Sequence, residues 1–528
     1  MSSVPSDAHA IAAGADSAAG GKARAASSEP WILAATILGS SMSFIDGTVV
    51  NVALPALQRD LRATGADVQW VVESYALFLA ALILVGGSLG DRLGRRIVYA
   101  VGIGIFTLAS VWCGLAPNVT QLIIGRAVQG IGGALLVPGS LAIISAAFDG
   151  AQRGKAIGTW SGFTTVTSAL GPVLGGYLVT LSWRWVFFIN VPLAALTLFL
   201  VFRHVPESRD EGEQGRLDIL GSALATLGLG ALVYGLIEWG ATTRLGDPVV
   251  LASLTIGVVA LALFLLAEDR ERNPMMPLSL FRSRTFSGAN ALTLLLYGGL
   301  GGALYFLPFN LQQVQGYSAL EAGAALLPFT AVVFALSRWT GGLVGRVGAK
   351  IPLTAGPLIV AAGFVLFART GVGGSYWTTY FPAVLVMSAG MALVIAPLTT
   401  TVMGAVDQNR SGLASGVNNA VSRAAGLLAI AVLGIVVATA FNSSLDNNLS
   451  ALKTSPAVTA TLDKQRAKLA GVQIPRTVGV REHAALQRAI GDSYVSGFRL
   501  AMLTAAGLAV ISAAIAFFFI EGKGAAGS

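Results

Sequence analysis

The chain has little charge and a single cysteine. Asp, Glu, Lys and Arg make up only 11% of its 528 residues, whereas 54% are hydrophobic. A water-soluble domain of this length does not need so many apolar residues to fill its core, so the composition predicts an integral membrane protein. Cys113 has no partner for an internal disulfide. The three histidines lie outside the apolar runs, which argues against a histidine-based metal site within the membrane.

The sequence also lacks the strict alternation of apolar and polar residues that is typical of membrane-spanning strands, which disfavours a β-barrel. It contains instead apolar runs with few charges, such as residues 76–90, 251–267 and 501–520. Such runs are typical of helices that cross about 30 Å of hydrocarbon. The net charge of +8 does not indicate a nucleic-acid partner, because the basic residues are scattered over short connections between the runs. We expect the protein to contact membrane lipid and not nucleic acid.

The apolar runs, and the charged residues that separate them, predict an all-α integral membrane protein with about fourteen transmembrane helices. An even number places both termini on one side. The short connections on that side carry most of the Lys and Arg, so we expect both termini in the cytoplasm and a multi-pass protein of the cytoplasmic membrane. The spans are expected to begin near Trp31, Gln69, Arg96, Gln121, Arg153, Trp185, Leu217, Val249, Phe286, Leu320, Lys350, Thr378, Ala420 and Tyr494.

The predicted organisation is two six-helix halves with two extra helices between them. Residues 1–30 are rich in Ala, Ser and Gly and have no apolar core, which indicates a disordered cytoplasmic tail and not a signal peptide. The remaining expected parts are the N-terminal half at 31–204, the linker helices with their flanking loops at 205–285, the C-terminal half at 286–520 with a long extracytoplasmic loop at about 441–493, and a cytoplasmic tail at 521–528.

The stretch GSLGDRLGRR, residues 87–96, concentrates charge in a turn between two spans. Residues 86–96 align with residues 340–350, where Gly94 matches Gly348. The second copy has glycine in place of Asp91. The match indicates an internal duplication, and paired membrane repeats are the usual architecture of secondary transporters.

Asp46 is expected deep within the first span, about 22 Å from its start at 1.5 Å per residue. A carboxylate at that depth is costly unless it is protonated or paired. Asp46 is therefore a candidate proton carrier or a counter-charge for a cationic substrate, and the alternative is a structural hydrogen bond to neighbouring helices.

Glu73 and Arg126 are two further ionisable residues within predicted spans. Glu73 is expected just inside the outer end of its span, where a solvated carboxylate at the interface is the favoured alternative to proton coupling. Arg126 is expected a few residues inside its span, where it either couples to a nearby carboxylate or anchors the helix at the interface.

Several motifs together resemble the major facilitator superfamily, and the fourteen spans resemble its drug:proton antiporter family. The resemblance covers the chain from Trp31 to about Phe519. It rests on FIDGTVVNVALP (44–55), GSLGDRLGRR (87–96), IIGRAVQGIGGA (123–134), GPVLGG (171–176), SWRWVFFINVP (182–192) and LQQVQGYSALEAG (311–323). The family pattern usually has one more glycine, at the position of Thr167.

This resemblance implies the major facilitator fold and export of amphipathic or cationic small molecules in exchange for protons. It implies proton coupling through Asp46 and Arg126, and Glu73 is a second candidate carboxylate because it lies within a predicted span. The glycines and proline of 171–176 would form a kinked antiporter helix, and the turn at 87–96 would latch the two halves in one facing state. The residues concerned are Gly171, Pro172, Gly175 and Gly176 in the helix, and Gly87, Asp91, Arg92, Gly94, Arg95 and Arg96 in the turn.

No enzyme signature is present, because the glycines and lysine at 150–156 lack the spacing and the Ser/Thr of a phosphate loop. We therefore expect no cofactor, and energy from the proton gradient. Accessory export proteins are possible partners. An exporter or uptake symporter for a specific metabolite remains an alternative, as does a membrane sensor that moves no substrate.

Overall fold

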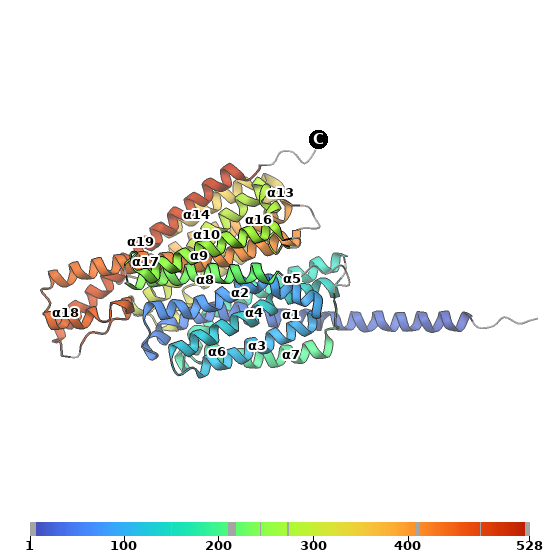
Figure 1. The fold of residues 1–528 in the computed structure, drawn as a ribbon, viewed down its shortest axis with the longest axis horizontal. Coiled ribbons are helices and arrows are strands. Elements are labelled where there is room, and N and C mark those ends of the chain that lie inside the picture. The colour runs from blue at the N-terminus through green and yellow to red at the C-terminus, as the bar shows by residue number, and fades with distance from the viewer. Residues whose placement is uncertain are drawn as a thin grey trace, which may run out of the picture.

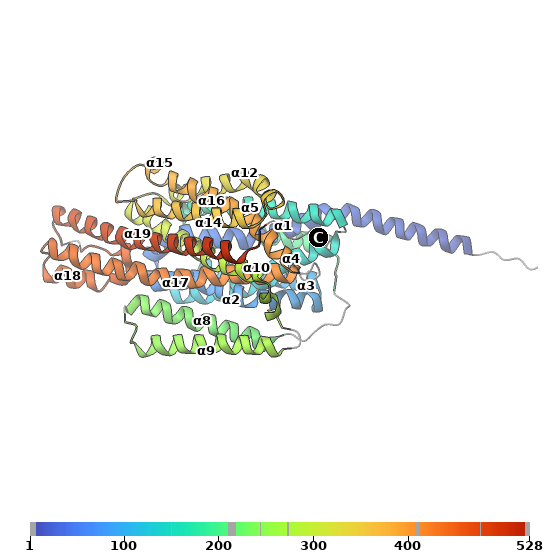
Figure 2. The ribbon, with the colours of Figure 1, turned by 90° about the horizontal axis from the view of Figure 1, so that it is seen from above.

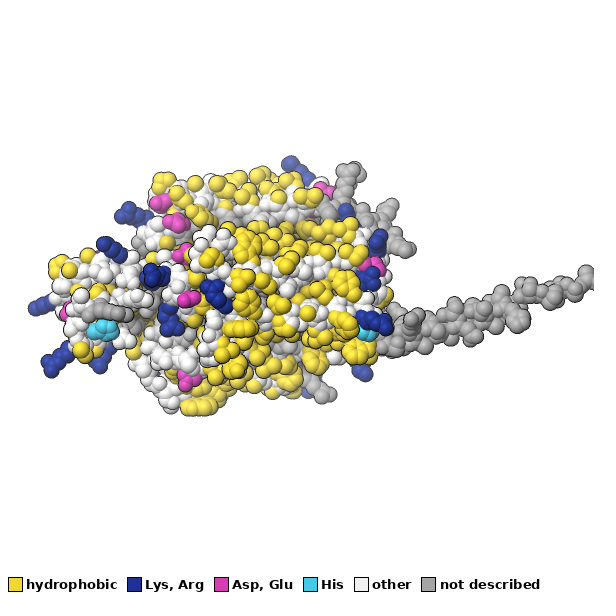
Figure 3. All heavy atoms as spheres, turned by 90° about the horizontal axis from the view of Figure 1, so that it is seen from below, with side chains coloured by type: hydrophobic (Ala, Val, Ile, Leu, Met, Phe, Trp, Pro, Cys, Tyr) yellow, Lys and Arg dark blue, Asp and Glu magenta, His cyan; other side chains and the backbone are white. Residues whose placement is uncertain are grey.

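The computed structural model describes residues 7–148, 150–209, 218–242, 244–271, 274–406, 411–475 and 477–522, and no strand occurs among them. Within this part of the chain, fourteen helices are long and apolar enough to cross a membrane, which confirms the predicted number. On the face that Figure 3 shows, exposed apolar side chains cover the middle of the molecule, with Lys and Arg toward its two ends. This apolar region fits a lipid-facing surface.

The N-terminal half and the linker hairpin are built from long helices joined by short turns. In the N-terminal half, a short helix α6 leads directly into α7, and the two together form its sixth span. The bounds are α1 (Asp7–Asp60), α2 (Gly65–Leu93), α3 (Arg95–Leu115), α4 (Val119–Ala147), α5 (Gly150–Leu181), α6 (Trp185–Phe188) and α7 (Asn190–His204), followed by the linker hairpin α8 (Ile219–Thr242) and α9 (Pro248–Arg270).

The C-terminal half has the same kind of architecture with more interruptions. Its first helix ends in a π-helical turn, η2. The bounds are η1 (Leu278–Arg282), α10 (Arg284–Phe309), η2 (Asn310–Val314), α11 (Ala319–Ala324), α12 (Leu327–Gly341), α13 (Leu343–Val347), α14 (Lys350–Ala368), α15 (Tyr376–Thr379), α16 (Phe381–Gly404), α17 (Ser411–Ala451), α18 (Pro456–Asp463), η4 (Arg466–Gly471) and α19 (Val480–Phe519).

The two halves lie side by side (Figure 1). One end of the bundle carries the α2–α3 turn and the last residues of α19, and we call it the terminal end. We call the other the α18 end. The linker hairpin lies on one flank (Figure 2), where Val233 and Ile237 of α8 join an apolar cluster with α2 and α17. The hairpin therefore covers one seam between the halves.

The duplication is visible in the backbone. Gly94 between α2 and α3 has a φ of 115°, and the aligned Gly348 between α13 and α14 has a φ of 79°. Residues with a Cβ rarely adopt positive φ, so both copies need glycine at this turn.

Two segments differ from the sequence-based expectation. Helix α1 begins at Asp7, so most of the expected disordered tail at 1–30 is helical, in line with the high helix propensity of its many alanines. The expected loop at 441–493 is also largely helical, because α17 and α19 run on beyond their apolar parts. Leu445 and Leu449, and likewise Leu486 and Ile490, lie one turn apart and are buried, so this polar segment is amphipathic.

Small residues set the distance between α2 and α4. A Cβ added to Gly86 would lie 2.0 Å from the carbonyl oxygen of Ala134, whereas one added to Gly104 of α3 would meet nothing within 4 Å. Small residues allow membrane helices to approach closely and pack well.

We expect Gly86→Ala to lower the stability of the protein by about 1–3 kcal/mol, because two backbones must separate. The matched control Gly104→Ala should melt at or slightly above the wild-type temperature, since alanine favours a helix. Thermal unfolding of both variants in lipid nanodiscs measures the difference. Equal melting temperatures would show that the α2–α4 contact tolerates separation.

Candidate functional site

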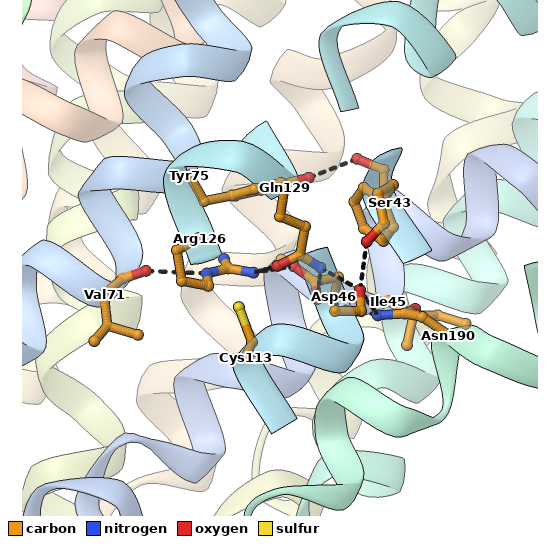
Figure 4. A network of polar contacts seen from close by, with 12 residues as sticks. Ser43, Ile45, Asp46, Val71, Tyr75, Cys113, Arg126, Gln129 and Asn190 are labelled. Carbon is orange, nitrogen blue, oxygen red and sulfur yellow. Dashed lines mark hydrogen bonds and ion pairs between the residues drawn. The ribbon is translucent and has the colours of Figure 1, made fainter. Parts of the chain in front are cut away.

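The candidate site is a buried polar network centred on Asp46 of α1 (Figure 4). Its carboxylate is 0% exposed. It accepts hydrogen bonds from Arg126 Nη1 at 2.5 Å, from Gln129 Nε2 at 2.8 Å and from Asn190 Nδ2 at 3.3 Å. Helices α1, α4 and α7 therefore meet at one carboxylate.

Arg126 of α4 is the counter-ion of Asp46. Its side chain is 1% exposed, so the interface anchor that we considered for it is wrong. Its Nε donates to the carbonyl oxygen of Val71 at 3.0 Å, and its guanidinium carbon lies 4.2 Å from the centroid of the Tyr75 ring. The cation is thus held by a carboxylate, a carbonyl of α2 and an aromatic face.

Further hydrogen bonds complete the network. Gln129 Oε1 accepts from Arg126 Nη1 at 2.6 Å, while Gln129 Nε2 also donates to Ser110 Oγ at 2.9 Å. Asn190 Nδ2 donates to the same hydroxyl at 3.2 Å. A buried ion pair is maintained only when hydrogen bonds compensate its lost hydration, and these neutral groups supply them. Removing either charge would leave the other unpaired in the interior.

Gln129 and Asn190 were not among the expected site residues. Both lie within stretches that carry the family resemblance. Gln129 also lies three residues after Arg126 and hence on the same helix face, which is a signal that the sequence does contain.

Glu73 of α2 lies apart from this network. Its side chain is 0% exposed, and neither carboxylate oxygen has a hydrogen-bond partner in the described parts of the chain. The solvated position at the interface that we expected is therefore wrong. The carboxylate is close enough to Tyr305 of α10 for an electrostatic interaction, which places it where the two halves face each other.

The turn at 87–96 makes its polar contacts within the N-terminal half. Asp91, near the end of α2, pairs with Arg95, the first residue of α3, at 2.8 Å. The backbone nitrogen of Arg96 donates to Glu207 at 3.0 Å, and a Cβ on Gly94 would meet the same carboxylate. Arg92 has no described partner, and a Cβ on Gly87 would make only ordinary contact with α4. Among the described residues, no hydrogen bond or ion pair joins this turn to the C-terminal half.

The helix motif at 171–176 has two faces. A Cβ on Gly171 or Gly175 would strike α1, at Thr48 and Val49 respectively. On the other face, a Cβ on Gly176 would lie 2.5 Å from the carbonyl oxygen of Ala319, and one on Gly323 would lie 2.1 Å from that of Pro172. One face thus packs inside the N-terminal half, and the other packs against α11 of the C-terminal half.

The halves are joined by hydrogen bonds toward the α18 end. Gln312 Nε2 donates to the carbonyl oxygen of Val52 at 2.9 Å, and Gln313 Nε2 donates to Gln58 Oε1 at 2.9 Å. Gln58 in turn donates to the carbonyl oxygen of Lys468 in η4 at 3.3 Å. Together with the glycine contacts of α5 and α11, these bonds close the α18 end.

The family model for the Major Facilitator Superfamily matches residues 36–430. The chain belongs to this superfamily. Its members are membrane transporters and not enzymes, as expected from the missing enzyme signatures. The structural similarity agrees: a bacterial homologue of the human lysosomal transporter Spinster, in an inward-facing and unoccupied conformation, has a TM-score of 0.62 at 19% identity over 93% of this chain and 96% of that one.

Curated relatives within the superfamily cover almost the whole chain. The multidrug resistance protein Stp of Mycobacterium tuberculosis is 36% identical over 489 residues, which is 91% of this chain and 90% of that protein. The tetracenomycin C resistance and export protein of Streptomyces glaucescens is 34% identical over 504 residues, covering 93% and 91%. The puromycin resistance protein of Streptomyces alboniger is 32% identical over 498 residues, covering 93% and 92%.

Proposed function

We propose that this facilitator exports amphipathic small molecules across the cytoplasmic membrane in exchange for protons, with both termini in the cytoplasm. The names of its relatives support drug export, since they include a multidrug resistance protein and an antibiotic export protein. The fully buried Asp46–Arg126 pair carries the proposal for the proton, because an ionisable pair within the membrane needs a functional reason.

Protonation of Asp46 would remove the charge that holds Arg126. The guanidinium would then retain neutral partners, among them the Val71 carbonyl, Gln129 and the Tyr75 ring, and α1, α2 and α4 could rearrange around it. A proton that binds one arrangement better than the other shifts their populations. If the substrate binds the opposite arrangement better, binding of the substrate favours release of the proton, and the two are coupled.

Glu73 is the second proposed proton site. A buried carboxylate without a partner is stable in lipid when it carries a proton. Since Glu73 lies near Tyr305 of the other half, we propose that separation of the halves at the α18 end would hydrate it. We propose that this proton leaves or binds as the transporter changes its facing state.

The described conformation corresponds to the inward-facing state in this proposal, with the α18 end on the outer side. The turn at 87–96 is then unlatched, since Asp91 pairs with its own neighbour Arg95. Energy comes from the proton gradient, and a proton that crosses 100 mV supplies about 2.3 kcal/mol. No cofactor is required, and accessory export proteins would attach at the outer side.

The test is proton release from everted membrane vesicles that have been acidified inside. Adding a panel of dyes and antibiotics should release protons from wild-type vesicles and not from vesicles without the protein. Glu73→Gln vesicles should release fewer protons per molecule of substrate, because one carrier is missing. Substrate accumulation in intact cells without resistance would identify an uptake system instead, and binding without any flux would identify a sensor.

A further inference from the structure

Helix α17 carries one charged residue between Ser411 and Phe441, and this is Arg423. Its Nε is buried without a hydrogen-bond partner, and no ion pair to Arg423 occurs in the described parts of the chain. The side chain as a whole is partly buried. A buried guanidinium nitrogen without a hydrogen-bond partner is costly at membrane depth, so a partner absent from this conformation would stabilise it.

Arg423 faces the N-terminal half. It is close enough to Tyr75 of α2 for an electrostatic interaction across the boundary between the halves. The carboxylate behind Tyr75, that of Asp46, already has Arg126 as its counter-ion at 2.5 Å. Glu73 forms no bond with Arg423 either, since both of its oxygens are unpartnered. Among the described residues, no carboxylate therefore forms an ion pair with Arg423.

A polar stripe on α17 leads to Arg423. Ser415, Asn418, Asn419 and Ser422 recur at helical spacing, and Arg423 lies at the edge of this stripe, one turn after Asn419. The four residues of the stripe line a cavity of about 210 Å³, which α10 and α16 complete, and Arg423 comes directly after the last of them, Ser422. Within the described part of the chain, the residues that line this cavity include no acidic one.

Hydrogen bonds hold one polar side chain of the cavity wall in place. Asn418 Nδ2 donates to Asn290 Oδ1 at 3.1 Å and to Thr293 Oγ1 at 2.7 Å, which fixes the amide on the cavity wall. Asn419 and Ser422 have no described protein partner and can bind a ligand. The cavity lies in the part of α17 toward the terminal end, away from the hydrogen bonds that close the α18 end.

We propose that Arg423 and this polar stripe bind an anionic, oxygen-rich part of the substrate, such as a carboxylate next to hydroxyl or carbonyl groups. The guanidinium offers a planar pair of donors that matches a carboxylate. The neutral amides and hydroxyls of the stripe suit uncharged oxygens. This inference rests on the proposed function and changes the expected substrate class from cations toward acidic amphipathic molecules.

The experiment measures binding to the full chain in phosphatidylcholine nanodiscs, with fluorescein as the anionic probe and ethidium as the cationic probe. Arg423→Gln should weaken fluorescein binding about tenfold or more and should leave ethidium binding unchanged or slightly stronger. Arg423→Lys should restore part of the fluorescein affinity. Arg369→Gln, which removes a basic residue at the α18 end, is the matched control and should bind both dyes like the wild type.

Equal fluorescein binding by wild type and Arg423→Gln would overturn the inference. An equal loss for both dyes would do so too, because Arg423 would then act on conformation. Nanodiscs containing phosphatidylglycerol test whether the anionic group at this site comes from a substrate or from a lipid headgroup. If phosphatidylglycerol weakens fluorescein binding to the wild type but not to Arg423→Gln, a lipid headgroup competes for the same site. An effect of phosphatidylglycerol that persists in Arg423→Gln would place the lipid elsewhere and leave the substrate assignment intact.

Transport in everted vesicles separates this inference from the proposed function. Export of ethidium with neither binding nor export of fluorescein would refute the anionic site and retain proton-driven export. Binding of fluorescein through Arg423, with no proton-driven flux of any compound, would retain the site and refute export.

Discussion

Asp46→Asn is expected to abolish proton-driven export and to destabilise the protein by about 3–5 kcal/mol, the usual cost of leaving a buried charge unpaired. The charge left without a counter-ion is that of Arg126, whose side chain is 1% exposed. The double variant Asp46→Asn with Arg126→Gln removes both charges and leaves amides that can hydrogen-bond to each other and to Gln129. It should therefore melt near the wild-type temperature and still transport nothing.

Thermal unfolding in nanodiscs and substrate-driven proton release from vesicles check this pair of outcomes. The control is Asp91→Asn, which breaks a pair whose carboxylate side chain is 43% exposed and should therefore change stability by less than about 1 kcal/mol. Recovery of transport in the double variant would show that the ion pair serves structure only. Full stability of the single variant would show that Arg126 finds another partner.

Hydropathy predicted the spans well, because crossing hydrocarbon imposes one length on every helix. In the described chain, all spans except the last two begin within a few residues of the expected starts. The last two were expected near Ala420 and Tyr494, whereas their helices begin at Ser411 and Val480. Both helices contain polar residues outside the apolar part, and hydropathy does not detect where such a helix begins.

The site was only partly predictable. Its depth in the span predicted that Asp46 is buried, which the structure confirms, whereas its proton-coupling role stays a prediction. Its pairing with Arg126 depends on the rotation of α1 and α4, which a single sequence does not give. Glu73 was misplaced because α2 begins at Gly65, four residues before the expected Gln69, which puts the carboxylate about 6 Å deeper. Arg423 was overlooked, although a lone charge in a long apolar run was a sufficient signal.

The two faces of α5 explain why its motif needs several glycines. Gly171 and Gly175 allow α1 to approach within the N-terminal half, and these contacts persist if the halves move as rigid bodies. Gly176 packs on α11, which belongs to the other half, so this contact exists only while the α18 end is closed. Substitutions on the second face should thus change the conformational equilibrium and not the fold.

Gly323→Val is accordingly expected to open the α18 end and to reduce export by about tenfold or more. Its Cβ would lie 2.1 Å from the carbonyl oxygen of Pro172, and no side-chain rotation can relieve a clash with the backbone. Gly176→Val should act in the same way from the opposite helix. Spin-label distances should lengthen between Thr180→Cys and Thr378→Cys at the α18 end. They should shorten between Leu93→Cys and Val347→Cys, the repeat-related positions at the terminal end.

The chain suits this measurement because Cys113, its one cysteine, is fully buried and leaves the introduced thiols as the accessible ones. Gly507→Val is the control, because a Cβ there meets nothing within 4 Å, and it should keep both distances and wild-type export. Gly323→Val should also keep a wild-type melting temperature, because each half retains its own packing. A lower melting temperature with unchanged spin-label distances would contradict the prediction. The α5–α11 contact would then belong to a single rigid body and would not form and break during transport.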